Sequence, residues 1–266
     1  MRTRIHGLGR RQLGLGLLML TLLFAYVGPL LVTADPHSQD LMAVLQAPDQ
    51  QHWLGTDHFG RDMFSRLVHG SALSIGLALL TVLCAAIPGS MLGILAGWNR
   101  GWLDRLLSHL TDMFMALPGL LLVLLILAFA PGNTVALFVG LSLTLWVEFF
   151  RVSRNRTQTM LAMPYVEASR QLSFGRVYLL KRVVLPGLLP EILMLSGFAI
   201  TTALVAIATL SAISVGLQPP TAELGTLIAD VMPYYADAPW LVLAPSLVIM
   251  IFVLSIQLLC GERRHD

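Results

Sequence analysis

The side chains best suited to chemistry form no catalytic pattern in this sequence. The phosphate-binding pattern GxxxxGKS/T is absent, and the single lysine, Lys181, follows no glycine-rich loop. The zinc pattern HExxH and a serine–histidine nucleophile pair are also absent, and we interpret His109, the histidine expected at membrane depth, as structural. The sequence therefore predicts neither an ATP-binding site nor a protease centre in this chain.

Acidic residues beside long apolar runs are the next candidates for chemistry. Asp112, Glu148 and Glu191 occupy such places, where a charge is costly unless it lines a cavity or pairs with a cation. All three lie near the expected inner ends of their runs, and Glu148 has Arg151 one helical turn on. We expect an ion pair between these two residues rather than a proton-coupled site at the membrane midplane.

Membrane helices must position these side chains. The chain has 266 residues, of which 56% are hydrophobic and 12% charged. Unpaired backbone groups are costly in hydrocarbon, so each long apolar run is expected to be a helix. The sequence predicts an all-α integral membrane protein with six transmembrane helices over residues 13–33, 72–98, 106–130, 134–152, 187–214 and 240–260.

The first apolar run follows a cluster of arginines and therefore resembles a signal peptide. It is longer than a cleavable signal and reaches the length of about 20 residues that spans a bilayer, so we expect an uncleaved helix. Cys84 and Cys260 both lie in apolar runs. Buried free thiols are expected there rather than a disulfide or a metal site.

The distribution of basic residues predicts the orientation of the chain. Of the 17 Lys and Arg residues, 15 fall on one side of the predicted spans, and that side is expected to be cytoplasmic. The predicted organisation is a cytoplasmic N-terminus at 1–12, a first transmembrane helix at 13–33, a periplasmic loop at 34–71, a five-helix core at 72–260 with a cytoplasmic loop at 153–186, and a cytoplasmic C-terminus at 261–266. A net charge of +2 does not favour a nucleic-acid partner. The apolar helices are instead expected to be surrounded by membrane lipid.

The cytoplasmic loop combines a short helix, a bend and a second basic segment. Residues 165–175 read YVEASRQLSFG, and VVLP follows at 183–186. This resembles the EAA loop of ABC importer permeases, whose pattern is EAAxxxG followed downstream by IxLP. Ser169 and Ser173 replace the second alanine and the glycine of the pattern, so we expect Gly175 to supply the turn. The positions that match are Glu167, Ala168, Val183, Leu185 and Pro186.

The resemblance implies that this loop couples the chain to an ATPase subunit. The residues expected to take part are Tyr165, Glu167, Ala168, Ser169, Arg170, Leu172, Ser173 and Gly175. Small residues on one helix face allow another surface to approach closely, and the flanking arginines could make charge-assisted contacts with it. The alternative is a basic amphipathic loop that lies on anionic lipid headgroups.

The periplasmic loop carries the most specific resemblance. Residues 52–67, HWLGTDHFGRDMFSRL, are similar to the stretch after the first span of dipeptide, oligopeptide and nickel permeases. We expect its charges to form local ion pairs or backbone hydrogen bonds in a compact turn. No metal site is expected, because the histidine at the start of the stretch belongs to the family pattern. The matching residues are His52, Leu54, Gly55, Thr56, Asp57, Gly60, Arg61, Asp62, Ser65 and Arg66.

Two further stretches, DMFMALP at 112–118 and GLQPPTAELG at 216–225, resemble the same permeases, with a slight lean toward nickel permeases at 112–115 and 220–223. The resemblance is closest to the second permease subunit of the family. It implies a type I ABC importer permease in the bacterial inner membrane that moves a small solute, such as a peptide, nickel or a metal chelate, into the cytoplasm.

The same resemblance implies the partners of the chain. They are a homologous second permease subunit, two ATPase subunits or one ATPase heterodimer, and a periplasmic solute-binding protein. ATP and Mg would be bound by the ATPase partners, and no cofactor is expected in this chain. The alternatives from other classes are a stand-alone secondary transporter and, behind it, an intramembrane enzyme.

Overall fold

The computed structural model describes the backbone of residues 2–260 and the side chains of residues 10–169 and 171–260. The predicted C-terminal tail at 261–266 and the side chain of Arg170 lie outside this part. The described chain is helical, with an isolated antiparallel bridge between Thr56 and Asp62. Its elements are α1 (Arg2–Leu31), α2 (Met63–Asn99), α3 (Trp102–Met115), α4 (Gly119–Phe129), α5 (Thr134–Leu161), α6 (Pro164–Gln171), α7 (Arg176–Leu179), the π-helical turn η1 (Leu180–Val184), α8 (Leu185–Ala212), α9 (Leu224–Val231), the 3-10 turn η2 (Met232–Tyr234) and α10 (Pro239–Cys260).

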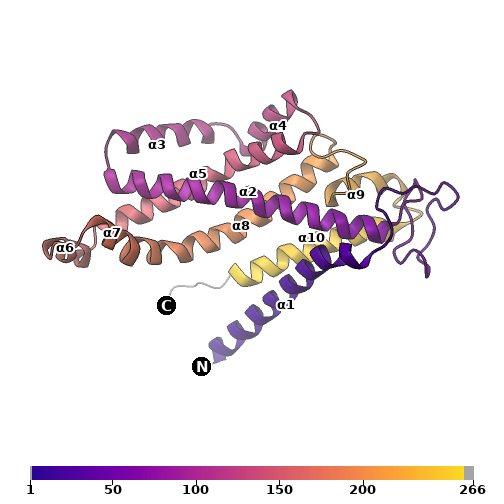
Figure 1. The fold of residues 1–266 in the computed structure, drawn as a ribbon, viewed down its shortest axis with the longest axis horizontal. Helices are drawn as coiled ribbons and strands as arrows, with labels where there is room; N and C mark the ends of the chain where they lie inside the picture. The colour runs from indigo at the N-terminus through magenta and orange to yellow at the C-terminus, as the bar shows by residue number, and fades with distance from the viewer. Residues whose placement is uncertain (1, 261–266) are drawn as a thin grey trace. The chain divides into compact units, whose positions relative to one another are not determined.

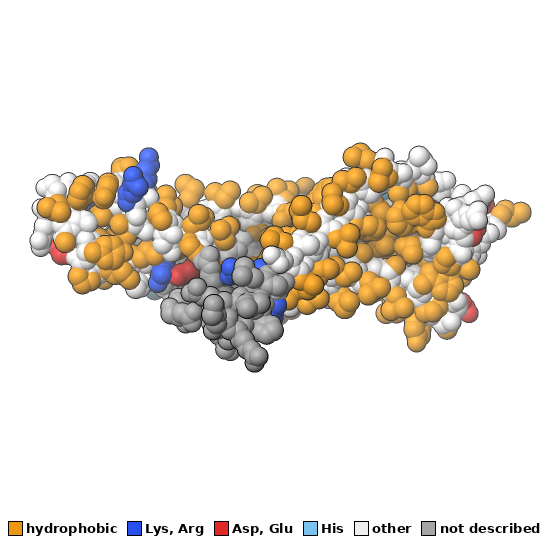
Figure 2. Space-filling model, turned by 90° about the horizontal axis from the view of Figure 1, so that it is seen from below, with side chains coloured by type: hydrophobic (Ala, Val, Ile, Leu, Met, Phe, Trp, Pro, Cys, Tyr) orange, Lys and Arg blue, Asp and Glu red, His pale blue; other side chains and the backbone are white. Residues whose placement is uncertain are grey.

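Several of these helices are long and apolar enough to cross a membrane. In the part of the chain that the structure describes there are five such helical segments, and the bent pair of α3 and α4 makes a sixth if it is counted as one span. Figure 2 shows apolar side chains over most of the face that it draws. Such a surface is typical of a protein surrounded by lipid.

The predicted third span is not one straight helix. α3 and α4 meet at an angle of 80°, and the break falls at residues 116–118, which end in Pro118. Proline restricts the residue before it to extended backbone and cannot donate a helical hydrogen bond. The sequence analysis included this proline in a motif but did not recognise it as the end of a helix.

Two helices are longer than the membrane spans predicted for them, and polar side chains lie in the added turns. α2 begins at Met63 and not at residue 72, since the Asp62 carboxylate accepts the backbone N–H of Ser65 at 2.6 Å and caps the helix. α5 continues to Leu161 instead of ending near 152. Its last turns carry arginines that pair with acidic groups elsewhere, as described below.

The chain divides into two compact units. The first comprises Met1–Leu79, Leu127–Leu137 and Thr201–Asp266. Within it α1 and α10 lie side by side (Figure 1), and α9 packs against α10. A buried apolar cluster joins the start of α2 to α9 and α10 through Met63, Leu67, Leu224, Leu227, Val231, Ala238 and Leu241.

The second unit comprises Leu80–Ile126 and Phe138–Ile200. Here α2 presents Gly89, Gly93 and Gly97 to α5. A methyl group on any of these glycines would lie 2.5–2.7 Å from a backbone carbonyl oxygen of α5, so only glycine permits this helix spacing. The three carbonyls belong to Trp146, Phe150 and Arg154. We call these three positions the glycine ladder.

Ion pairs in the second unit differ from the predicted one. Arg151 pairs with Asp112 at 2.6 Å rather than with Glu148. Arg154 binds Asp104 through two nitrogens, and Arg156 lies 2.9 Å from Glu191. The prediction of buried thiols was also wrong, because Cys84 is exposed and Cys260 partly exposed. In a membrane protein an apolar run can face lipid as readily as a core.

Candidate functional site

Two regions hold the residues that the sequence singled out, and the first is the loop around α6. Pro164 is the first residue of α6, where its missing N–H is no loss. Val166 is fully buried and packs in an apolar cluster with Leu161, Leu179 and Val184. This single side chain therefore anchors the short helix to the end of α5 and to the segment that follows the bend.

The opposite face of α6 is exposed. Tyr165 and Ala168 are three residues apart on one side of α6. Leu172 directly follows the helix, and its N–H bonds to the carbonyl of Ala168 at 3.1 Å, so it continues the same side. Tyr165 is 52% and Leu172 72% exposed. Glu167 is exposed beside them, whereas Ser169 is only partly exposed and its hydroxyl donates to the carbonyl of Tyr165 at 2.8 Å. The helix thus presents apolar area to its surroundings.

The bend after α6 adds two aromatic rings that the sequence analysis missed. Phe174 and Tyr178 stack with ring centroids 4.4 Å apart and an interplanar angle of 16°. Both rings are exposed, at 43% and 44%. Their spacing of four residues, across a bend, could have indicated the pair. Together with Tyr165, Ala168 and Leu172 these rings form what we call the coupling surface.

The conformation of the bend corrects one expectation. Ser173 has φ of +62°, a left-handed conformation that favours glycine. Gly175, which was expected to supply the turn, has extended backbone with φ of −69° and ψ of 164°. Ser173 stands where the EAA pattern has glycine, so the left-handed conformation falls at the glycine position of the pattern although the residue differs.

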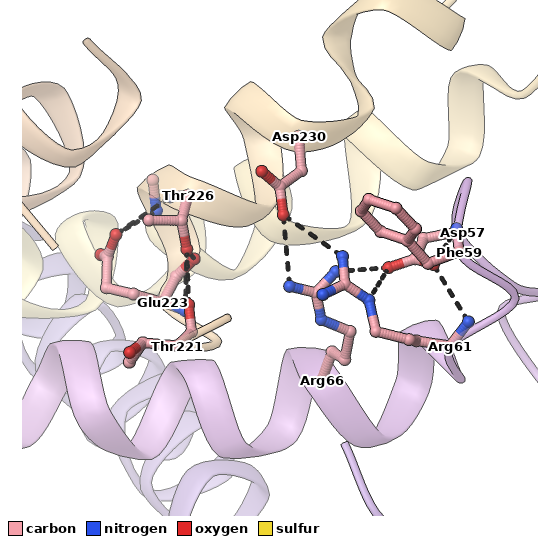
Figure 3. A network of polar contacts seen from close by, with 9 residues as sticks. Asp57, Phe59, Arg61, Arg66, Thr221, Glu223, Thr226 and Asp230 are labelled. Atoms are coloured by element: carbon pink, nitrogen blue, oxygen red, sulfur yellow. Dashed lines mark hydrogen bonds and ion pairs between the residues drawn. The ribbon is translucent and has the colours of Figure 1, made fainter. Parts of the chain in front are cut away.

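The second region is the outer-loop network, made by Asp57, Arg61, Arg66 and Asp230. Asp57 and Arg66 are fully buried, and Arg61 is nearly so. The Asp57 carboxylate accepts Nε of Arg61 at 2.7 Å, a second bond from Arg66, and the backbone N–H groups of Phe59 and Arg61 at 2.8 and 3.0 Å. Figure 3 shows both guanidinium groups turned toward this carboxylate.

Asp230, at the end of α9, completes the network. Its carboxylate lies 3.5 Å from Arg61 and 3.3 Å from Arg66, and its side chain is 14% exposed (Figure 3). The local pairing predicted from the charge spacing is therefore present, but its fourth member comes from far along the chain. Two buried positive charges are matched by two carboxylates, of which Asp57 is the closer.

Electrostatics favour the charged form of Asp57. Burial alone would raise the pKa of its carboxyl, but the N–H of Arg61 and the positive charge of Arg66 outweigh burial and leave the pKa below its usual value. Burial lowers the pKa of His58, whose ring stacks on Tyr234 at 5.2 Å. A neutral imidazole adds no further positive charge beside the two arginines.

The remaining residues of the loop shape its turns. Gly55 and Gly60 have φ near +70°, and a side chain on either would collide with a backbone carbonyl, of Gln46 and Asp40 respectively. The hydroxyl of Thr56 accepts the N–H of Gln46 at 2.9 Å. Leu54 packs beside the apolar cluster of the first unit. These residues hold the backbone rather than a ligand.

Asp62 and its neighbours attach the loop to α2. Besides capping the helix, the Asp62 carboxylate lies 2.8 Å from Nδ1 of His52. The hydroxyl of Ser65 donates to the carbonyl of Ala34 at 2.6 Å, which joins the end of α1 to the start of α2. Among the side chains described, no group of three or more His, Cys, Asp or Glu residues could hold a metal ion.

Glu223 fixes the other end of α9. Its buried carboxylate accepts the N–H groups of Gly225 and Thr226 at 2.8 and 3.1 Å and the hydroxyl of Ser74 from α2 at 2.9 Å. Figure 3 shows Glu223 beside Thr226. The Thr226 hydroxyl in turn accepts the N–H of Glu223, which closes a capping box. α9 is therefore bonded to α2 through Glu223 at its start and through Asp230 at its end.

Comparison with known proteins assigns the chain to a family. Residues 89–261 match the family described as binding-protein-dependent transport system inner membrane component. The chain belongs to this family. The permease is 35% identical over 259 residues to the di/tripeptide transport system permease protein DppC of Pseudomonas aeruginosa, covering 95% of this chain and 85% of that protein.

Other relatives of the permease carry related names. It is 31% identical over 221 residues to the glutathione transport system permease protein GsiD of Pectobacterium atrosepticum, covering 83% of this chain and 73% of that protein. It is 30% identical over 242 residues to the probable D,D-dipeptide transport system permease protein DdpC of Escherichia coli, covering 91% and 81%. The predicted dipeptide and oligopeptide permease family is confirmed, and the lean toward nickel stays a prediction.

A solved structure confirms the predicted type I importer fold of the permease. The MetNI methionine ABC transporter in inward-facing conformations matches with a TM-score of 0.58 and 19% identity, covering 73% of this chain and 93% of that chain. At this identity the likeness shows the fold alone. The stand-alone secondary transporter and the intramembrane enzyme are set aside, because the chain is a permease subunit of a binding-protein-dependent importer.

Proposed function

We propose that this permease subunit imports short peptides and is driven by ATPase subunits that bind the coupling surface. The observation that carries the proposal is the exposed apolar face of α6, on a helix anchored by the buried Val166. An apolar face left open beside a firm anchor suits a protein partner. The ATPase subunits would bind ATP and Mg and hydrolyse the ATP, and this chain would need no cofactor.

Short peptides are the proposed substrate class because the relatives are named for di- and tripeptides, D,D-dipeptides and glutathione. These solutes share a peptide-like backbone with charged ends. Nickel or a metal chelate is the alternative, because residues 112–115 and 220–223 resemble nickel permeases. Transport of labelled dipeptide and of radioactive nickel by the reconstituted importer would decide between them.

The proposed assembly contains this chain, a homologous second permease subunit, two ATPase subunits or one ATPase heterodimer, and a periplasmic solute-binding protein. We place both termini in the cytoplasm of a bacterium and the protein in its inner membrane, because 15 of the 17 basic residues would then face the cytoplasm. An alkaline phosphatase fusion at residue 45 should be active and one at residue 160 inactive.

Replacement of Ala168 by Arg tests the coupling surface. Added bulk and charge in a water-excluding contact cost about 2 kcal/mol or more, which weakens binding more than tenfold. The variant should insert and pair with its partner permease but lose ATPase association and substrate-stimulated hydrolysis. Asn155→Arg adds the same charge at an exposed position of α5 and should behave as wild type. Normal transport by Ala168→Arg with the ATPase still bound would refute the proposal.

A further inference from the structure

A groove of ≈ 260 Å³ lies between the C-terminal end of α2 and the segment after the coupling bend. Its walls are apolar, and its rim carries an indole, an amide and a guanidinium. All its residues belong to the second unit. They are Ile94, Leu95, Trp98 and Asn99 from α2 and Arg176, Val177 and Leu180 from α7 and η1.

The groove is open along its apolar walls. Leu95 is 48% and Val177 64% exposed. Contact of such surface with water costs about 25 cal/mol per Å², so an apolar occupant is favoured. The volume is below the roughly 300–1,000 Å³ of pockets that enclose a small-molecule ligand. Part of one hydrocarbon chain, lying along the surface, fits these walls better than an enclosed solute.

The charged residues near the groove favour an occupant that carries an anionic group beside its hydrocarbon chain. Trp98 lies in the last turn of α2 and Arg100 directly follows the helix, and such aromatic and basic residues are enriched where a helix leaves the bilayer. Arg176, Lys181 and Arg182 are exposed on the facing segment. Within the described side chains none of these three pairs with an acidic group. Arg176 lines the groove, and Lys181 and Arg182 follow it on the same segment, so this positive charge complements a phosphate attached to an acyl chain.

We propose that this groove binds one anionic phospholipid of the cytoplasmic leaflet. An acyl chain lies against Leu95, Val177 and Leu180, and the phosphate accepts charge-assisted hydrogen bonds from Arg176. The proposal rests on the orientation given under the proposed function, because the C-terminal end of α2 must face the cytoplasm. It would place a lipid beside the coupling bend, so membrane composition would act on the segment that meets the ATPase.

Native mass spectrometry of the chain with its partner permease, without ATPase subunits, tests the proposal. Phosphatidylglycerol is the probe, with phosphatidylcholine and inorganic phosphate as separate arms. Wild type should retain phosphatidylglycerol and neither of the other two. Arg176→Gln should weaken its retention about tenfold, the expected loss of one strong charge-assisted contact. Val177→Trp should do the same by filling the groove while every charge stays.

Arg105→Gln is the matched control, since Arg105 is exposed on α3 outside the groove and is expected on the same side of the membrane. It should retain the lipid as wild type does. Equal loss in Arg105→Gln and Arg176→Gln, or equal retention of phosphatidylcholine, would overturn the proposal. Displacement of the lipid from wild type by added ATPase subunit would also overturn it, because the groove would then belong to the ATPase contact.

Failure of the proposed function is separable from failure of this inference. The lipid measurement uses no ATPase, so Ala168→Arg should keep phosphatidylglycerol whether or not it binds its ATPase partner. An inverted fusion pattern would instead show that the orientation is wrong, before any lipid is added.

Discussion

The outer-loop network and the coupling surface differ in whether their side chains find partners within the chain. In the network, buried charges from the loop, α2 and α9 find partners within the chain, and Asp57 alone accepts four donors. On the coupling surface, Tyr165, Leu172 and Phe174 remain between 43% and 72% exposed. A region that satisfies its own groups can hold its shape alone, whereas one that leaves apolar area open is completed by a partner.

Substitution of Asp57 should have the largest effect on the stability of the outer-loop network. Asp57→Ala leaves two buried arginines with the more distant Asp230 as their carboxylate. Removal of one partner from a buried charge network costs about 3–5 kcal/mol. We expect a large fall in melting temperature of the purified permease pair and loss of assembled protein from membranes.

Asp237→Ala removes a carboxylate that is exposed and lies in the same unit. It should leave melting unchanged. If Asp57→Ala had the same melting temperature as Asp237→Ala but changed which solute is transported, Asp57 would be a substrate ligand and the structural interpretation would be wrong.

Acid should weaken the network through the same carboxyl. The pKa of Asp57 is lowered in the folded protein, so its contribution to stability is present above the pKa of the unfolded chain and is lost as pH falls through the lowered folded value. The melting difference between wild type and Asp57→Asn should be full at pH 7 and shrink toward about pH 3. A difference that stayed constant over this range would show that Asp57 contributes through its shape alone.

At the coupling surface, removal of the aromatic pair should change binding more than folding. Phe174→Ala combined with Tyr178→Ala removes two exposed rings, so the permease should melt nearly as wild type. Aromatic anchors at an interface often contribute about 1 kcal/mol or more each, so loss of both should weaken ATPase binding roughly thirtyfold in a titration of the reconstituted pair.

Tyr235→Ala is the control for this double variant, because Tyr235 is 62% exposed but follows η2 in the first unit. Its ATPase affinity should equal that of wild type. Unchanged affinity in the double variant would restrict the docking contact to α6 itself.

The smallest expected effect is at Ser173. Its left-handed backbone costs roughly 1 kcal/mol that glycine would avoid, so Ser173→Gly should stabilise the bend by about 0.5–1 kcal/mol. Slower hydrogen exchange at residues 172–178 would report it. Ser169→Gly lies inside α6 and should instead destabilise the segment by about 0.5 kcal/mol. Destabilisation by both changes would mean that the Ser173 side chain has a role of its own.

The sequence predicted features that depend on local pattern and missed those that depend on distant partners. Long apolar runs predicted the helices because hydrocarbon forces the backbone to pair with itself. Spacing predicted that Asp57 would meet Arg61, but Asp230 lies 169 residues beyond Arg61 and nothing local points to it. The start of α2 was missed because Asp62 was interpreted as a loop charge and not as a helix cap.

The coupling region shows the same division. The short helix predicted in the cytoplasmic loop is α6, which begins at Pro164, and proline at a first helical position is a local signal. The turn residue was assigned to Gly175 because glycine usually adopts positive φ, yet Ser173 adopts it. Residue type alone gave the wrong position, because the packing of Val166 and Leu179 on either side of the bend constrains the path of the backbone.

The glycine ladder has a mechanical consequence. At these glycines the backbone of α2 lies directly against carbonyl oxygens of α5, and the nearest side-chain atoms are mostly Cβ atoms, which do not move when a rotamer changes. Two residues separate the end of α5 from the start of α6, and Val166 packs against Leu161 at that end. A displacement of α6 is therefore transmitted to the end of α5, a helix that is held against α2 by direct backbone contact.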